Sequence, residues 1–250
     1  MTQFADALKT WRKARRYSQL ELALEAEVSS RHLSFLETGR ANPSRDMIQR
    51  LGDALDLPLA VRNQFLAQAG FAARYPQRDW SSEEMAPIRG AVEYTLRRHA
   101  PYPAVAVDRH WTILQMNTPA EQLLGLIGAR IGVSMIDLVQ DESVQAMIEN
   151  WPEVAYHTAQ RLRVESAARG GDERLEAAIE ALSMAPIPES EPVGPVIPTI
   201  YRAGDMRLSL FTTIAQFGTP EDLALDDLKI ELFFPADDAT AGALEALASA

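Results

Sequence analysis

Length, composition and charge limit what this chain can be. It has 250 residues, 47% of them hydrophobic, which is enough to bury one large core or two smaller ones. The absence of cysteine excludes disulfides and thiolate metal sites, and no apolar run approaches the roughly 20 residues that a membrane-spanning helix needs. The N-terminus also lacks the apolar stretch of a signal peptide, so we expect a cytoplasmic protein that does not enter a membrane.

The net charge of −11 is unevenly distributed along the chain. Residues 1–78 carry 12 Lys and Arg against 8 Asp and Glu, a net of +4, whereas the remaining residues carry 12 against 27, a net of −15. This distribution indicates a small basic module joined to a larger acidic body, whose charge limits indiscriminate binding to phosphate backbones.

The first 70 residues are predicted to form five short helices. Ser18 and Glu21 have the spacing of a capping box at the start of the second helix, whose apolar positions are Leu20, Ala23 and Leu24. The five helices are expected at Phe4–Arg15, from Ser18 to a break near Glu27-Val28, from Ser29 to about Thr38, from Ser44 to Leu57-Pro58, and over Leu59–Ala69.

The rest of the chain mixes helical and strand-like periods. The apolar pattern changes to alternation after Pro101, and prolines between Pro186 and Pro198 predict a loop. Strands are expected at Ala104–Asp108, Trp111–Asn117, Val196–Arg202, Met206–Phe217 and Leu228–Phe234, and helices at Pro87–Arg98, Thr118–Leu126, over most of Ser134–Ser183 with a break at Gly170-Gly171, and at Thr240–Ala250.

These elements predict two domains. Residues 1–72 are expected to form an all-α, five-helix domain, residues 73–86 a linker, and residues 87–250 an α+β domain. Five strands with helices inserted between them predict one antiparallel sheet of about five strands, covered by helices on one face.

The second and third helices have the pattern of a helix-turn-helix. Ala23 is small where two helices cross, and Leu33 and Leu36 dock the third helix on the core. Arg31 can then pair with a guanine edge, and Phe35 can touch a thymine methyl or pack at the domain edge instead. The residues expected at DNA are Gln19, Ser29, Ser30, Arg31, Ser34 and Phe35, with Arg12, Arg16, Arg40 and Asn42 supplying phosphate contacts.

The N-terminal pattern resembles the XRE (Cro/C1-type) helix-turn-helix family over about residues 4–70. Glu27 departs from the family, in which many members carry glycine at this turn, and Glu37 is expected to bond within the domain, to an arginine, rather than to DNA. The resemblance rests on Ser18-Gln19-Leu20-Glu21-Leu22-Ala23, Val28-Ser29, Arg31, Leu36-Glu37, Gly39-Arg40 and Pro43-Ser44.

The second domain resembles the MmyB-like regulators, which couple an XRE module to a PAS-like ligand-binding domain. The residues that carry this resemblance are Gln68–Phe71, Tyr102–Asp108, Trp111, Asn117, Phe217–Pro220 and Phe233–Asp237. It implies a sensor of a fatty-acid-like or other small hydrophobic molecule, with no other cofactor. Residues on the predicted strands that are expected either to line its pocket or to form core are Trp111, Leu114, Met116, Tyr201, Leu210 and Phe211.

Catalysis and metal binding receive little support from the sequence. No two of the four histidines have metal-ligand spacing, and no glycine-rich phosphate loop is present, so we expect no catalytic and no metal site. His157, on a predicted helix, is the one candidate haem ligand, as in some PAS domains.

These observations favour a one-component transcription regulator that binds double-stranded DNA, senses a small hydrophobic ligand and acts as a homodimer. Two other readings remain open. One is an antitoxin-like or adaptor protein with a helix-turn-helix fold, whose acidic domain binds a basic protein partner. The other is an enzyme with a DNA-binding head that regulates its own gene.

Overall fold

A computed structural model describes residues 2–187, 196–204 and 206–248. Contacts within the chain divide it into two compact units, with the main boundary between Gln77 and Arg78. Each unit is described by itself. None of the helices in the described residues is both long and apolar enough to cross a membrane.

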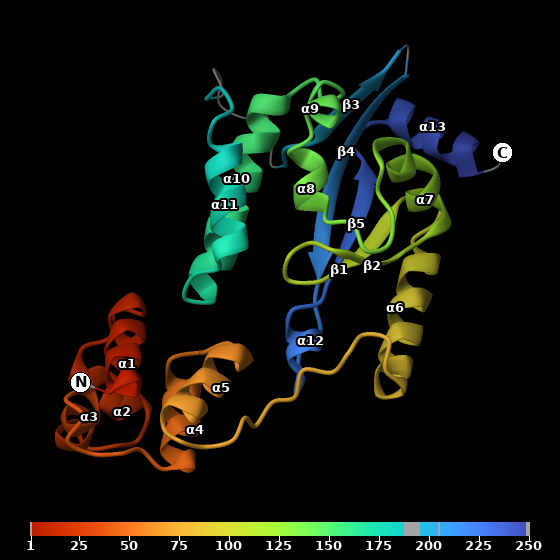
Figure 1. Ribbon diagram of the computed structural model, residues 1–250. Helices are drawn as coiled ribbons and strands as arrows, with labels where there is room; N and C mark the ends of the chain where they lie inside the picture. Colours follow the sequence, from red (N-terminus) through yellow and green to blue (C-terminus); the bar gives the residue numbers. More distant parts are fainter. Residues whose placement is uncertain (1, 188–195, 205, 249–250) are drawn as a thin grey trace. The chain divides into compact units, whose positions relative to one another are not determined.

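The N-terminal unit contains the five predicted helices (Figure 1). Three of the predicted caps are present, because the hydroxyls of Ser18, Ser29 and Ser44 each accept a hydrogen bond from the backbone N–H three residues later. Glu21 completes the capping box by accepting from the Ser18 N–H at 2.7 Å. The helices are α1 (Gln3–Ala14), α2 (Gln19–Glu25), α3 (Ser30–Glu37), α4 (Arg45–Ala54) and α5 (Leu59–Gln68).

The apolar face of α2 differs from the prediction. Leu22 and Ala23 are buried, whereas Leu20 and Leu24 are 60% and 71% exposed. The helix has only two turns and buries one narrow arc, on which Leu22, Ala23 and the following Ala26 lie. Leu20 and Leu24 are four residues apart and share the opposite side, so the sequence pattern assigned the wrong leucines to the core.

The core of the N-terminal unit takes residues from every helix. Phe4 meets Phe65 edge-to-face with ring centroids 5.3 Å apart, which joins the first helix to the last. Leu33 and Leu36 are fully buried, as predicted, and hold α3 against this core. The α3 helix is therefore held against the core on one side and exposed to solvent on the other.

The C-terminal unit is built on a five-stranded antiparallel sheet in the order β2-β1-β5-β4-β3. The strands match the predicted ones to within a few residues. They are β1 (Ala104–Val107), β2 (Ile113–Met116), β3 (Thr199–Ala203), β4 (Met206–Ala215) and β5 (Lys229–Pro235). Part of the predicted loop Pro186–Pro198 lies outside the described residues, as does the end of the predicted helix Thr240–Ala250.

Helices follow and separate the strands of this unit. Figure 1 shows α8, α10 and α11 on one side of the sheet, and α13 contacts β4 and β5. The helical segments are η1 (Glu83–Met85), α6 (Ala86–Arg98), α7 (Thr118–Leu124), η2 (Gly125–Ile127), α8 (Met135–Val139), α9 (Glu142–Gln145), α10 (Trp151–Ala168), α11 (Glu173–Leu182) and α13 (Asp238–Ala248). The short helix α12 (Leu223–Asp226) belongs to the N-terminal unit by its contacts, although it lies between β4 and β5 in the chain.

Strand register decides which side chains face these helices. Thr212 pairs with Phe233 and Val105 with Glu231, and paired residues of antiparallel strands share a face of the sheet. Val105 and Phe233 belong to the buried core that includes residues of α7, α8, α10 and α11. Glu231 therefore points toward the helical layer even though it is charged.

Asn117 connects the end of β2 to α7. Its side-chain oxygen accepts from the N–H of Ala120, which caps α7, and from the N–H of Ala104 at the start of β1. Its amide nitrogen donates to the carbonyls of Leu96 and Tyr102. This single buried side chain caps α7 and ties α6, β1 and α7 together.

Candidate DNA interface and ligand cavity

The exposed side of α3 is the candidate DNA-reading surface. Its N-cap, Ser29, accepts from the His32 N–H at 3.1 Å, so the helix begins at Ser30. Ser30 and Arg31 are exposed at the N-terminal end, where a recognition helix contacts base edges. The Arg31 guanidinium lies over the Phe35 ring, 5.4 Å from its centroid. Arg31 and Phe35, one turn apart, therefore act as a packed pair on this surface.

Arg12 has a structural role that the sequence did not indicate. It was expected to contact phosphate, but its side chain is 11% exposed and forms a two-point ion pair with Glu37, which is 2% exposed. The Arg12 Nε and Nη2 atoms lie 2.5 and 3.0 Å from the carboxylate oxygens, and Nη1 donates to the Tyr17 carbonyl at 2.8 Å. The paired guanidinium and carboxylate groups hold α1 to α3. Arg12 is therefore not available for a phosphate contact.

Gln19 joins the same network, because its side-chain amide donates to the second Glu37 oxygen at 2.8 Å. Burial of Glu37 opposes ionisation, but the hydrogen bonds from Arg12 and Gln19 outweigh it and hold the pKa of Glu37 below its usual value. Glu37 thus bonds within the domain to an arginine, as predicted. The network joins α1, α2 and α3 and fixes the position of the recognition helix.

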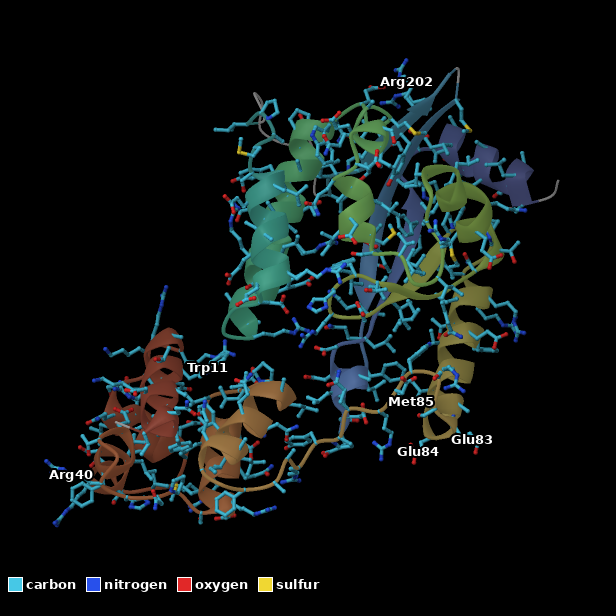
Figure 2. The ribbon with its side chains drawn as sticks, in the orientation of Figure 1. Trp11, Arg40, Glu83, Glu84, Met85 and Arg202 are labelled. Carbon is cyan, nitrogen blue, oxygen red and sulfur yellow. The ribbon has the colours of Figure 1, made fainter. Side chains whose placement is uncertain are left out.

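The other predicted DNA residues surround α3. Ser34 is half-buried on the helix, whereas Arg16, Arg40 and Asn42 are exposed on the segments that flank it. Figure 2 shows Arg40 on the outer side of the N-terminal helices. In the described part of the chain, neither Arg16 nor Arg40 forms an ion pair, so both cations remain available to phosphate oxygens.

The turn before α3 explains the departure at Glu27. Its backbone has φ +54°, in the left-handed region that glycine adopts at low cost. The Glu27 carbonyl accepts from Arg50 Nη1 at 3.1 Å, which ties the turn to α4. At this turn a glutamate adopts a backbone conformation that glycine reaches at lower cost.

A cavity of about 340 Å³ in the C-terminal unit is the candidate ligand site. Its volume falls within the range of small-molecule pockets. Residues of β3, β4, β5, α8 and α10 form its walls. The lining residues are Trp111, Met135, Ile136, Val139, Ile148, Val154, His157, Thr158, Arg161, Leu162, Ile197, Thr199, Tyr201, Thr212, Glu231 and Phe233.

The structure places two of the six predicted ligand residues, Trp111 and Tyr201, in this cavity. Leu210 faces the same side of the sheet but is buried in the core, and Phe211 points to the opposite face, where it stacks on Phe234 with centroids 5.5 Å apart. Met116 lines a separate cavity of about 390 Å³, and Leu114 lines neither. Strand alternation and register produce this division, because adjacent strand residues face opposite sides.

Trp111 is not part of a strand, contrary to the prediction. The strand begins at Ile113, and Trp111 has φ +61°, which is unusual for a bulky residue. Its indole N–H donates to Glu165 at 3.1 Å, and the Arg161 guanidinium and Lys229 ammonium lie 4.1 and 3.9 Å from its ring centroid. These contacts hold the strained backbone conformation and fix the ring at the cavity wall.

The sequence analysis missed the charged residues of the cavity. Arg161 on α10 and Glu231 on β5 line the cavity, whereas Glu165 and Lys229 contact Trp111 and do not line it. The signal was present in β5, because Lys229 and Glu231 alternate with Ile230 and Leu232 in a strand that is otherwise hydrophobic. Which of the two alternating sets faces the helices could be known only from the register.

Tyr201 lines the cavity and keeps a hydroxyl that can form hydrogen bonds there. Burial raises the pKa of the Tyr201 hydroxyl, and the negative charge of Glu231 raises it further. The phenol therefore stays protonated at neutral pH. His157, the candidate haem ligand, also lines this cavity, on the α10 side.

Comparison with known proteins identifies two families in the chain. Residues 88–247 match the family described as MmyB-like transcription regulator ligand binding domain, and residues 8–61 match a helix-turn-helix family. No curated protein matches the chain. The first match covers more than half of the chain and contains the whole sheet and its cavity, and the second contains α2 and α3. The chain therefore belongs to the MmyB-like transcription regulators and carries an XRE-type helix-turn-helix at its N-terminus.

Proposed function

We propose that this DNA-binding regulator is a one-component sensor. Its helix-turn-helix reads an operator in the major groove, and its C-terminal domain, which is PAS-like, senses a small hydrophobic, fatty-acid-like ligand in the 340 Å³ cavity. The observation that carries the proposal is the combination, in one chain, of a firmly docked α3 with an exposed outer side and a sheet-and-helix domain with a cavity.

The DNA part is supported by the side chains around α3. Arg31 and Phe35 occupy the position of base-reading residues, with Ser29, Ser30 and Ser34 beside them. Arg16, Arg40 and Asn42 supply the phosphate contacts. Gln19 is the first residue of α2, and its amide donates to Glu37 while this end of the helix faces the DNA backbone. Arg12 acts from beneath this surface, by fixing Glu37.

The sensing part is supported by the lining of the cavity. Its apolar walls come from α8, α10 and β5, and include Ile136, Val139, Leu162 and Phe233. Such walls favour the body of a hydrophobic ligand. A single antiparallel sheet with helices and a cavity on one face is the architecture that the PAS-like reading requires.

We further propose that the regulator acts as a homodimer in the cytoplasm, where its DNA is. One small helix-turn-helix module buries too little surface for specific binding, and operators of such proteins usually contain two half-sites. A ligand regulates DNA binding by its differential affinity for the two states of the dimer.

Selection of genomic fragments by the purified full-length protein, at physiological salt, tests the DNA part. We expect enrichment of a short inverted repeat, because a two-fold symmetric dimer presents two identical α3 helices. Diffuse binding that disappears as salt is raised would contradict specific recognition, and would favour a protein partner bound by the acidic domain instead.

A further inference from the structure

The segment that follows α7 and the last turn of α13 form an exposed apolar surface on the C-terminal unit. Leu126, two residues after α7, is 68% exposed, and Leu247 of α13 is 40% exposed. The two helices contact each other, as Figure 1 shows. In α13 Leu244 is buried, and Leu247, three residues later, lies on the same side of the helix. The apolar stripe of α13 therefore continues beyond the core of its own domain.

Two small adjoining hollows lie in this surface. Their volumes are about 30 and 50 Å³, and Leu123, Leu126 and Met206 line both of them. Small-molecule pockets have volumes of at least about 300 Å³, so a small ligand does not account for these hollows. We call the surface that contains them the α7–α13 face. Its further lining residues include Pro119, Leu124, Ile127, Leu208, Leu244 and Leu247.

The α7–α13 face is uncharged on a strongly acidic domain. None of the described residues that line the two hollows carries a charge, although residues 79–250 have a net charge of −15. Two copies of such a domain repel each other wherever their carboxylates meet. At the α7–α13 face they can approach without this cost, and burial of the leucines favours the contact. A basic protein partner would bind the acidic surface instead, so a second copy is the partner that fits this face.

The shape of the face suits a two-fold symmetric contact. Such a contact uses the same surface on both copies, so that surface must carry both a projecting side chain and a recess that receives it. Leu126 projects into solvent, and it also borders both hollows. Leu126 of one copy can therefore enter a hollow of the other while the reciprocal contact forms. The two copies of Leu126 then lie close to the symmetry axis.

Tyr201 connects the α7–α13 face with the ligand cavity. It lines both the 340 Å³ cavity and the smaller hollow. A ligand that contacts Tyr201 in the cavity is therefore separated from the α7–α13 face by one side chain. A contact between two copies at this face is well placed to respond to the ligand, as regulation of a dimer requires.

We infer that the α7–α13 face is the surface through which two copies of this chain form the dimer. This inference rests on the proposed homodimer and names the side chains that hold it together. Leu126 and Leu247 are the central contacts, because they are the most exposed leucines that line the hollows.

Sedimentation velocity of the full-length protein, over a range of micromolar concentrations, tests the surface with Leu126→Lys and Leu247→Lys. We expect each substitution to raise the dissociation constant of the dimer at least about tenfold, because the contact would bury an ammonium group without a partner. Lysine also lowers the net negative charge of the domain, so overall repulsion between copies cannot cause the loss. Circular dichroism checks that the variants keep their fold.

Val164→Lys is the matched control. Val164 is 70% exposed on α10 and lines neither hollow, so the same change of charge at this position should leave the dissociation constant unchanged. A dimer that Val164→Lys weakens as much as Leu126→Lys does would place the contact elsewhere and overturn the inference.

A cross-link gives an independent measurement of the same geometry. The chain has no cysteine, so Leu126→Cys introduces its single thiol. We expect a short bis-maleimide to convert this variant to a covalent dimer, because the two copies of residue 126 lie close to the symmetry axis. Val164→Cys should remain a single chain under the same conditions.

The outcomes separate the inference from the homodimer on which it rests. An unchanged dissociation constant in both lysine variants, with no covalent dimer from Leu126→Cys, overturns the inference and leaves the homodimer supported. If the unmodified protein sediments as a monomer, both alone and with its selected operator, the homodimer itself is wrong. The inference is then wrong with it, and the face is left to a different protein partner.

Discussion

On the N-terminal domain an arginine can either stabilise the fold or remain exposed to contact DNA. Arg12 and Arg31 are both arginines near the predicted DNA surface. Arg12 is buried against Glu37, whereas Arg31 is exposed and rests on Phe35. A guanidinium already bonded on two nitrogens to a carboxylate has little to offer to DNA. The two positions therefore predict different consequences of substitution.

Arg31→Ala should weaken binding to the selected operator by about 1–3 kcal/mol, because it removes a contact to a base edge. Binding to unrelated DNA should change much less. Electrophoretic mobility shift titrations at fixed salt measure both affinities. Arg130→Ala, an exposed arginine of the C-terminal domain, serves as the control. An operator affinity that is equal in Arg31→Ala and in the unmodified protein would remove Arg31 from the reading surface.

Glu37→Gln should lower the free energy of unfolding by about 2 kcal/mol at neutral pH, because the charge-assisted bonds from Arg12 and Gln19 are weakened. The pKa of Glu37 is lower in the folded chain than in the unfolded one. Its stabilisation is therefore complete above the unfolded pKa of roughly 4.3 and is lost as the pH falls through the folded pKa.

Denaturant unfolding, followed by circular dichroism at several pH values, measures this dependence. The difference between Glu37→Gln and the unmodified protein should shrink as the pH falls below about 4. Glu25→Gln, on the exposed side of α2, should show no such difference. A gap that stays constant down to low pH would mean that the ionised form of Glu37 contributes nothing.

Among the structural elements, the α2–α3 turn shows how a local conflict is tolerated. Glu27 occupies a left-handed backbone conformation that costs a residue with a side chain of order 1 kcal/mol. The neighbouring helices are capped by Ser18 and Ser29, and Arg50 holds the turn carbonyl. These interactions impose the conformation, and the stability of the turn is reduced by the residue that occupies it.

Glu27→Gly should therefore raise the free energy of unfolding, by about 0.5–1 kcal/mol, because glycine adopts this conformation without strain. Glu25→Gly, at the last residue of α2, should lower it by about 0.5–1 kcal/mol, since glycine loses more conformational freedom when it is held in a helix. Thermal unfolding of both variants measures the contrast. Destabilisation by both substitutions would show that the positive φ of Glu27 stores no strain.

The sheet shows what alternation does to a candidate site. Phe211 and Thr212 are neighbours in β4, yet Thr212 lines the cavity and Phe211 stacks on Phe234 on the other face. Counting apolar residues on strands favours the phenylalanine. The pairing of β4 with β5 turns the threonine toward the cavity instead. A sequence analysis that looks only for hydrophobic pocket residues therefore does not find Thr212.

For the whole molecule, the proposed function depends on two copies of the chain. A dimer that reads an inverted repeat requires both half-sites on one side of the DNA, one helical turn apart or a multiple of it. The C-terminal domain, with a net negative charge and an apolar core of its own, is where we expect the dimer contacts. The dependence of affinity on the spacing of the half-sites therefore shows whether two chains bind the operator together.

Insertion of about 5 base pairs between the half-sites of the selected operator should lower affinity at least about tenfold, because it rotates one half-site to the opposite side of the helix. The same mobility shift titrations measure the loss, with the unaltered operator as the reference. Equal affinity for the operator, the spaced operator and a single half-site would show that one chain binds alone.

The sequence by itself determined the five N-terminal helices, their serine caps, the five strands and the family, because capping, periodicity and motif spacing are local properties. It also located the turn at Glu27 and the bonding of Glu37. It did not determine which leucines of α2 are buried, whether Arg12 is free, or which strand residues line the cavity.

Only the tertiary structure decided these points, because each depends on a partner far away in the chain. Arg12 meets Glu37 across 25 residues, and Lys229 meets Glu165 across 64. Strand register turned Glu231 toward the cavity, and a shift of one residue would have turned it to the opposite face. The charged lining of the cavity is therefore a property of the assembled fold.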